Sequence, residues 1–528
     1  MLWNGKYISF FRVRLYLRGA AWLSIIFFVL GHGLKSAKKN FCEKKMAKIF
    51  VIGTGPLLEK GVRKIGGHCL RTWHFVSPLL EDGHQISLVT LPIPNRDTPP
   101  EKFRESSEKR KVEGLVYTAV LKEEPSFLYP FLSREIERFR PDCILGINSH
   151  PSGVAARVAG AYPLWSDLNG WAMAEGQTRA RLDQDDCFLS YFWRDERDAG
   201  RRSDRFSTVS KNQKLALLGE LAALGRMNQF TFDYRFADVI ENAVNPLFSD
   251  LPGANGEPQL RGKRIPQNAF VVLWSGGFNT WTNVNLLYEA LARAMEKNER
   301  IYFVSTGGSI DGHDEITYTK FHKLLAASPH RKRFILLGWI EAELLPIVYS
   351  ESDVGINVDA ENYETLFGAR NRITNMLAAG LPVITTLGTE ISITIKEQRL
   401  GRTIPLNDSD AMAEAILEMA ENSNQTREMA HASRQFALEQ YSYPATTKPM
   451  REWAREPRLA PDNLEKTKQH PDEKNLLALW LSELEKTYAL LQDRDVEKLL
   501  IAERDLALIR EKPVFKLYKN IKGVLKKK

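Results

Sequence analysis

Cysteine is scarce in this chain. Its 528 residues include four, at positions 42, 69, 143 and 187, and no two of them form a Cys-x-x-Cys pair. Disulfide frameworks and thiolate metal sites need paired or clustered cysteines. The sequence therefore argues against both and predicts a protein of a reducing compartment.

The chain also lacks a long apolar run. Residues 19–34 (GAAWLSIIFFVLGHGL) are apolar but fall short of the ~20 residues that span a bilayer. Basic residues flank this segment, so it is compatible with a signal anchor or an uncleaved signal region. The favoured alternative is a start codon assigned too early, because Met46 is followed at once by a strand pattern at 48–53. Residues 1–45 are thus expected to be an extension that catalysis does not need.

The body of the chain has no net positive charge. The net charge of +8 divides into +8 for residues 1–45, +7 for 512–528 and −7 for 46–511. A nucleic-acid-binding protein carries a basic stripe on its folded body. The sequence therefore predicts no nucleic-acid partner.

The basic end of the chain favours a different partner. Residues 446–528 are expected to form a helical tail. At the end of this tail, lysines lie opposite four apolar residues at helical spacing, which are Leu517, Ile521, Val524 and Leu525. Basic amphipathic helices of this kind bind anionic membranes. The sequence predicts that residues 512–528 attach a cytoplasmic protein to the inner face of the cell membrane. The alternative is a solvated tail.

Short apolar runs alternate with helical stretches in two separate sets. This spacing is typical of βαβ units with parallel sheets, and predicts an α/β fold of two Rossmann-like, doubly wound domains facing across a cleft. A Pro- and Gly-rich linker at 246–268 would join a domain at 46–245 to a second at 269–445. Ligands of such sheets bind beyond the carboxyl ends of the strands. The expected strands are 48–53, 86–91, 115–120, 142–147, 164–168 and 206–210, then 270–274, 301–306, 334–338, 353–358 and 382–386.

The first of these strands is not followed by a dinucleotide fingerprint. Leu58 stands where the third glycine would be, and the second strand ends at Leu91 without an acidic residue. A nicotinamide enzyme is therefore disfavoured. Instead, Gly66, Gly67 and His68 precede a helix, where backbone amides can approach a ligand.

Several segments together resemble the family-four retaining glycosyltransferases of GT-B fold, over roughly residues 46–440. In the first domain these are GGHCLRTWHFVSPLLEDGHQISLVT (66–90), RPDCILG (140–146) and STVS (207–210). In the second they are LWSGGF (273–278), LLGW (336–339), SDVGIN (352–357) and AAGLPVITT (378–386). The resemblance implies transfer of a sugar, with retention, from a nucleotide-diphosphate donor to a saccharide or lipid-linked acceptor in cell-surface polysaccharide synthesis.

The segment 364–372 departs from the common family pattern. The loop 277–283 lacks the Arg and Lys that clamp the diphosphate, and Glu364 is followed eight positions later by Arg372 instead of a second glutamate. The segment is similar to an E…RxR variant of surface-polysaccharide transferases. A guanidinium can hold a diphosphate with two hydrogen bonds. The resemblance thus implies that Arg370 and Arg372 replace the missing clamp, the alternative being surface charge at a helix start.

The resemblance also implies roles for other residues at strand ends. His150 would lie near the reacting sugar and, with Glu364, Arg370 and Arg372, complete the catalytic set. The acceptor side would include Gly66, Gly67, His68, Asp167 and Asn169. Besides Glu364 and the two arginines, the donor side would include Gly276, Gly277, Asn279, Gly307, Gly308 and Trp339.

Asp-x-Asp triplets occur at 183–185, 408–410 and 493–495, but none follows an apolar strand. The sequence therefore predicts no metal site, and no cofactor besides the nucleotide sugar as co-substrate. Two other functions stay open. One is a GT-B-fold sugar-nucleotide epimerase, and the other is a catalytically silent binding subunit of the same fold.

Overall fold

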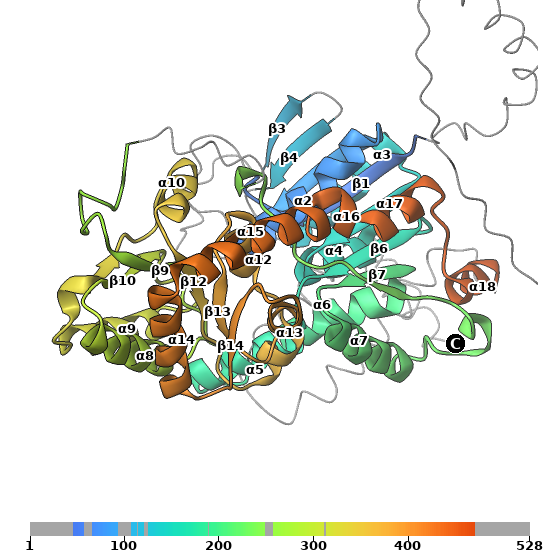
Figure 1. The fold of residues 1–528 in the computed structure, drawn as a ribbon. Coiled ribbons are helices and arrows are strands. Elements are labelled where there is room, and N and C mark those ends of the chain that lie inside the picture. Colours follow the sequence, from blue (N-terminus) through green and yellow to red (C-terminus); the bar gives the residue numbers. More distant parts are fainter. Residues whose placement is uncertain are drawn as a thin grey trace, which may run out of the picture. The chain divides into compact units, whose positions relative to one another are not determined.

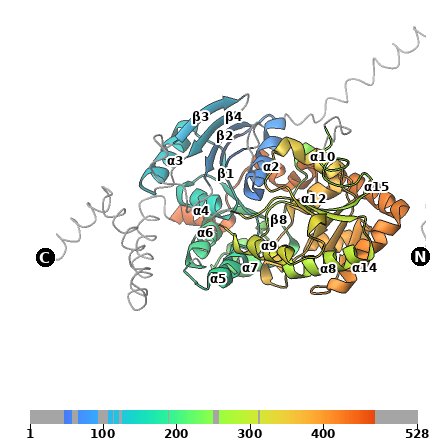
Figure 2. The same cartoon turned by 90° about the vertical axis from the view of Figure 1, so that its left-hand side faces the viewer.

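A computed structural model describes residues 46–57, 66–92, 107–112, 115–120, 125–187, 189–248, 257–310 and 313–469. The first half of this part forms one sheet in the order β3-β4-β2-β1-β5-β6-β7-β8. Only β3 runs antiparallel, to β4, and Figure 2 shows this edge of the sheet. The strands are β1 (Lys48–Thr54), β2 (Gln85–Leu91), β3 (Ser107–Val112), β4 (Leu115–Val120), β5 (Cys143–Ile147), β6 (Leu164–Leu168), β7 (Arg205–Thr208) and β8 (Ala237–Val239).

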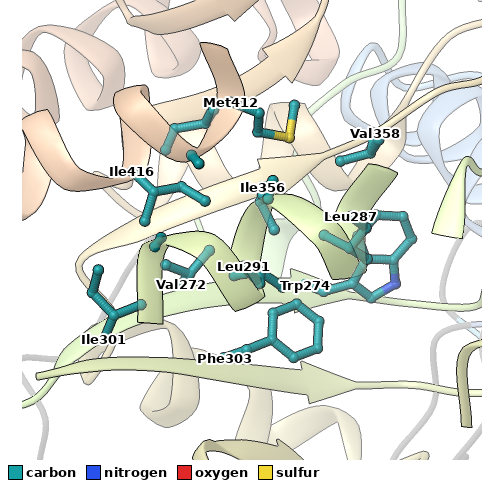
Figure 3. Close-up of a cluster of buried hydrophobic side chains, with 14 of the residues drawn as sticks. Val272, Trp274, Leu287, Leu291, Ile301, Phe303, Ile356, Val358, Met412 and Ile416 are labelled. Atoms are coloured by element: carbon teal, nitrogen blue, oxygen red, sulfur yellow. The ribbon is translucent and has the colours of Figure 1, made fainter. Parts of the chain in front are cut away.

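The second sheet is wholly parallel, in the order β11-β10-β9-β12-β13-β14. Its core is shown in Figure 3, where Trp274 and Phe303 of the sheet lie beside Leu287 and Leu291 of α8. The strands are β9 (Phe270–Ser275), β10 (Ile301–Thr306), β11 (Phe334–Leu336), β12 (Val354–Asn357), β13 (Val383–Thr386) and β14 (Gly401–Ile404).

Except at β3, helices connect successive strands of both sheets (Figure 1). In the first half they are α2 (Gly67–Glu81), α3 (Pro125–Phe139), α4 (Ser149–Val158), α5 (Ala172–Asp183), α6 (Leu189–Arg202) and α7 (Lys211–Ala223). In the second they are α8 (Val284–Lys297), α9 (Ile316–Ala326), α10 (Leu345–Ser350), α11 (Tyr363–Phe367), α12 (Asn371–Ala378), α13 (Glu390–Gln398), α14 (Ser409–Glu421) and α15 (Ser423–Gln440).

Both sheets reverse their strand order at the first strand, between β1 and β5 and between β9 and β12. Such a reversal opens a crevice at the carboxyl ends of the strands, where ligands of doubly wound folds bind. The predicted fold class, two Rossmann-like domains, is confirmed.

All eleven expected strands are present, but β3, β8 and β14 were not predicted. Each of the three lies at the edge of its sheet. An edge strand has one neighbour and tolerates polar residues, as in SEKRKV of β3 and GRTI of β14. An apolar run is therefore a poor guide to edge strands.

The C-terminal helices return to the first sheet, where Figure 1 shows α16 and α17 beside α2. They are α16 (Tyr443–Thr446), α17 (Lys448–Arg455) and α18 (Pro461–Gln469). Arg451 of α17 pairs with Asp82 at 2.6 Å, and Asp462 of α18 pairs with buried Arg226 at 2.5 Å. Residues 446–469 are thus helical and pack on the first domain.

The predictions for residues 1–45 and for the tail after residue 469 lie outside the described residues. Within the described ranges, no helix combines the length and apolar character needed to cross a membrane.

Candidate functional site

The structure brings the predicted donor-side glycines together. Gly276 and Gly277 follow β9, and Gly307 and Gly308 follow β10. Gly276 has φ +89°, which favours glycine, and a Cβ on Gly307 would overlap the Gly276 carbonyl. The two loops can approach this closely only because both carry glycine.

Trp339 packs against the same loops. Its Cζ2 atom lies 3.4 Å from the position that a Cβ on Gly277 would take. Its indole Nε1 donates a hydrogen bond of 2.9 Å to the carbonyl of Ser309. Asn279, also predicted on the donor side, lies in the loop after Gly277 and accepts a hydrogen bond from the amide of Thr282.

Arg372 is a cation in direct contact with these glycines. Its Nη2 donates to the carbonyl of Gly277 at 2.7 Å, and its guanidinium carbon lies 3.9 Å from the ring centroid of Trp274. Its Nη1 is buried and has no hydrogen-bond partner. Burial, together with the neighbouring charge of Arg370, lowers the pKa of Arg372 to about 10, so the side chain is charged at pH 7. A buried, charged donor without a partner needs an acceptor from a ligand.

The start of α12 meets the glycine loop of the first domain. A Cβ on Gly67 would lie 2.7 Å from the side-chain nitrogen Nδ2 of Asn371, the first residue of α12. Arg370, the N-cap residue, makes no side-chain cap hydrogen bond. The amides of a helix N-terminus favour an anion. Gly67 of the first domain therefore lies against the start of α12, one residue from Arg372.

Arg370 does not serve as the free clamp expected from the sequence. It is buried and bound to two carboxylates, with Nε 2.9 Å from Asp359 and Nη1 and Nη2 2.9 and 2.8 Å from Glu364. Burial alone lowers the pKa of Arg370, but Asp359 and Glu364 outweigh it and raise the pKa. The prediction that Arg370 binds the diphosphate is corrected: its charge is already neutralised inside the protein.

Arg370 instead orients Glu364, which the sequence placed in the site. Burial raises the pKa of Glu364 to about 7, even though the charge of Arg370 lowers it. Asp359, the second partner, was not predicted. It follows the end of β12 by two residues, and a strand-end carboxylate was the signal that could have revealed it.

Asp167 is the second correction. Its side chain is fully buried and accepts hydrogen bonds of 2.7 and 2.9 Å from Arg71 and one of 2.6 Å from Ser207. Arg71 also donates to the carbonyls of Ile240 and Glu241. The side chain of Asp167 is therefore not available to an acceptor hydroxyl. Through Arg71 it joins the end of β6 to α2 and to the segment that follows β8.

Asn169 belongs to a polar cluster at the strand ends of the first domain. Its side-chain amide donates at 3.0 Å to Asn148, whose own amide donates to Thr54 and to the carbonyl of His68. Asn148 has φ +78° and is the N-cap residue of α4. The His68 side chain is exposed. These contacts place Asn169 and His68 at the same edge of the sheet.

His150 lies in the first turn of α4, and its Nδ1 is 2.6 Å from Asp195 of α6. The sequence did not predict Asp195, because it lies 45 residues away in a charged helix that offers no motif.

Helix α5 joins the two halves and was not predicted as part of the site. The hydroxyl of Thr280 donates to Thr178 at 3.0 Å, and Arg179 donates to the carbonyl of His313. The carboxylate of Glu175 lies 3.9 Å from the ring of His313. Hydrogen bonds from α5 therefore set the position of the loop after β9 against the first domain. In the described part of the chain, no three His, Cys, Asp or Glu residues are arranged to hold a metal ion.

The comparisons with known proteins agree with this geometry. Residues 269–422 match the family model described as "Glycosyl transferases group 1". No characterised protein sequence matches the chain significantly.

Three solved structures share the fold at low sequence identity. Sucrose-phosphate synthase from Thermosynechococcus elongatus is 16% identical with a TM-score of 0.58, over 77% of this chain and 98% of that one. HepE from Anabaena, solved with UDP-glucose, is 15% identical with a TM-score of 0.52 over 77% and 98%. WaaG, described as a glycosyltransferase of lipopolysaccharide biosynthesis, is 15% identical with a TM-score of 0.51 over 76% and 98%.

The chain therefore has the two-domain GT-B fold, and the family match of its second domain supports a glycosyltransferase.

Proposed function

We propose that this protein transfers a sugar from a nucleotide-diphosphate sugar to a saccharide or lipid-linked acceptor, with retention, in cell-surface polysaccharide synthesis. It would be a family-four-like enzyme of the E…RxR variant. The observation that carries the proposal is the buried Nη1 of Arg372, a charged donor without a partner beside the Gly276–Gly277 loop.

The diphosphate fits this position for three reasons. Arg372 supplies a positive charge, and no carboxylate of the described residues forms an ion pair with it. The first amides of α12 supply further donors, and the space where a side chain of residue 276 would stand is open. Donors that are already in place where charge develops are the largest contribution to catalysis in many enzymes. Arg372 would thus stabilise the leaving diphosphate.

The other residues are assigned by their place around this anion site. Trp339 would lie against the nucleotide. Arg370 holds the carboxylate of Glu364, and each oxygen of that carboxylate keeps a further lone pair that would accept a hydrogen bond from a sugar hydroxyl. In the proposed reaction the acceptor oxygen bonds to the anomeric carbon while the bond to the diphosphate breaks on the same face, and the hydroxyl proton passes to the leaving phosphate. HepE was solved with UDP-glucose, which supports a nucleoside-diphosphate sugar as donor.

A thermal-shift screen of UDP- and GDP-sugars tests the function. The true donor at 100 times its Kd should stabilise the protein by about 2.7 kcal/mol. Stabilisation should persist in EDTA, because the sequence has no metal motif after a strand. If no nucleotide sugar stabilises the protein, the proposal fails. Conversion of the donor without any acceptor would indicate the epimerase, and binding without transfer would indicate the silent subunit.

We further propose that the protein is cytoplasmic and attaches to the inner face of the membrane through residues 512–528. A chain starting at Met46 should sediment with vesicles containing anionic lipid, and the same chain without residues 512–528 should not. Each lysine near an anionic surface contributes about 1 kcal/mol, which salt weakens. Equal binding by both chains, or binding that ignores salt, would contradict the assignment.

A further inference from the structure

The hydrogen bond between His150 and Asp195 supports a proposal that rests on the proposed function. We propose that Asp195 is a positioning residue, which holds His150 in the tautomer protonated at Nδ1 so that Nε2 accepts a hydrogen bond from a hydroxyl of a bound sugar. No motif of the sequence pointed to Asp195.

The geometry of the pair is well defined. His150 Nδ1 lies 2.6 Å from Asp195 Oδ2, and the two side chains are 27% and 3% exposed. A hydrogen bond of this length fixes the direction of the imidazole ring. Nε2 lies on the side of the ring away from Asp195, at the carboxyl edge of the sheet where α4 begins.

The proton of this hydrogen bond must belong to His150. Burial raises the pKa of Asp195, but the hydrogen bond from His150 and the charges of His150 and Arg157 outweigh burial and lower it. Asp195 is therefore a carboxylate at neutral pH and cannot donate. Nδ1 carries the hydrogen, which leaves a lone pair on Nε2 when the ring is neutral.

Arg157 holds Asp195 from the other side. Its Nη2 donates to Asp195 Oδ1 at 2.6 Å, and its Nε donates to Asp198 at 2.8 Å. The carboxylate thus offers one oxygen to Arg157 and the other to His150.

Close packing of α4 on α6 makes the pair possible, and Figures 1 and 2 show the two helices side by side. A Cβ on Gly153 of α4 would lie 2.7 Å from the Cβ of Asp195. Two further groups of α6 face the pair. The hydroxyl of Tyr191 is 3.3 Å from His150 Nδ1, and Nε of Arg194 is 4.0 Å from Asp195 Oδ1.

The role in sugar binding follows from where the ring lies. Packing alone requires only that the buried Asp195 be paired, which Arg157 already does. His150 is half-buried, two residues after Asn148, which joins the strand-end cluster of Asn169 and His68. When the imidazole is neutral, its Nε2 is an acceptor at this edge of the sheet, and it suits a hydroxyl of the donor or of the acceptor sugar.

Replacement of Asp195 by asparagine tests the proposal. The side-chain amide of asparagine has a single oxygen, which would accept the hydrogen bond from Arg157. The NH2 group of the asparagine would then donate to Nδ1 of His150, so the proton of the imidazole would move to Nε2. We expect kcat to fall on the order of 10- to 100-fold, as for other partners that orient a histidine. Stabilisation by the donor through Arg372 should be unchanged or weakened less than tenfold. A rise in KM for one substrate only would show which sugar His150 contacts.

Asp198→Asn is the matched control, because it removes the same charge from the same network without touching His150. Equal losses of kcat in the two variants would overturn the proposal. NMR of the ¹⁵N-labelled imidazole in the unaltered full chain gives an independent reading of the tautomer. An Nε2-protonated His150 there would refute the inference even if Asp195→Asn does not fold. A chain without transferase activity but with the Nδ1 tautomer would contradict the proposed function alone.

Discussion

Replacement of Arg372 by methionine should remove the stabilisation by nucleotide sugars and lower kcat/KM by at least about 100-fold, the typical effect of losing one preorganised donor at developing charge. Arg372 has a buried Nη1 without a partner, and it forms no ion pair with a carboxylate among the described residues. Methionine can fill the space beside Trp274, so the unfolding midpoint of the free protein should change little. Thermal shift and steady-state kinetics measure the two effects.

Arg293→Met is the control for this substitution. Arg293 lies on α8 in the same domain, and its guanidinium contacts Ser409 and exposed Asp410. It should bind nucleotide sugars like the unaltered protein. Normal binding by Arg372→Met would show that the anion site is elsewhere. Arg370 is unsuitable for this test, because its loss would leave Asp359 and Glu364 buried without a counter-charge.

Replacement of Arg71 by methionine should destabilise the protein by about 3–5 kcal/mol, the range observed when one partner of a buried ion pair is removed. Arg71 and Asp167 have side chains that are 1% and 0% exposed. Without Arg71, Asp167 would keep a buried charge with only Ser207 as a side-chain partner. The carbonyls of Ile240 and Glu241 would also lose their donor. Urea unfolding measures the loss.

An exposed pair supplies the comparison. Arg138 pairs with Glu135 on α3 and is 62% exposed, so Arg138→Met should cost about 1 kcal/mol or less. Replacing Arg71 by methionine together with Asp167 by leucine should recover much of the loss, since apolar pairs often replace buried ion pairs without penalty. A loss for Arg71→Met as small as that of Arg138→Met would contradict the structural role assigned to Arg71.

The interior strands were predictable because burial on both faces demands continuous apolar residues. All six residues of β9, FVVLWS, are buried, and so are the five of β5, CILGI. The sequence did not predict the edge strands β3, β8 and β14, because a strand at the edge of a sheet does not need continuous apolar residues. The sequence also shows the glycines at the strand ends. They are needed there because only glycine permits the close approach between Gly276 and Gly307.

The roles of the charged residues were not predictable in the same way. Arg370 and Arg372 stand two residues apart in one segment, and the sequence treats them alike. In the structure the first is bound by Asp359 and Glu364, while the second lies on Trp274 with one nitrogen unpaired. Likewise, Asp167 and Asn169 both end β6, but only Asp167 meets Arg71.

The sequence by itself determined the two doubly wound domains, most of their strands and the glycine loops at the strand ends, because these follow from local patterns of burial and turn residues. Only the tertiary structure decided which charges are free to act. That outcome depends on which carboxylate lies within hydrogen-bond distance of each cation, as Asp195 does for His150 from 45 residues away. Distant residues meet through packing, and a burial pattern along the chain does not record their pairing.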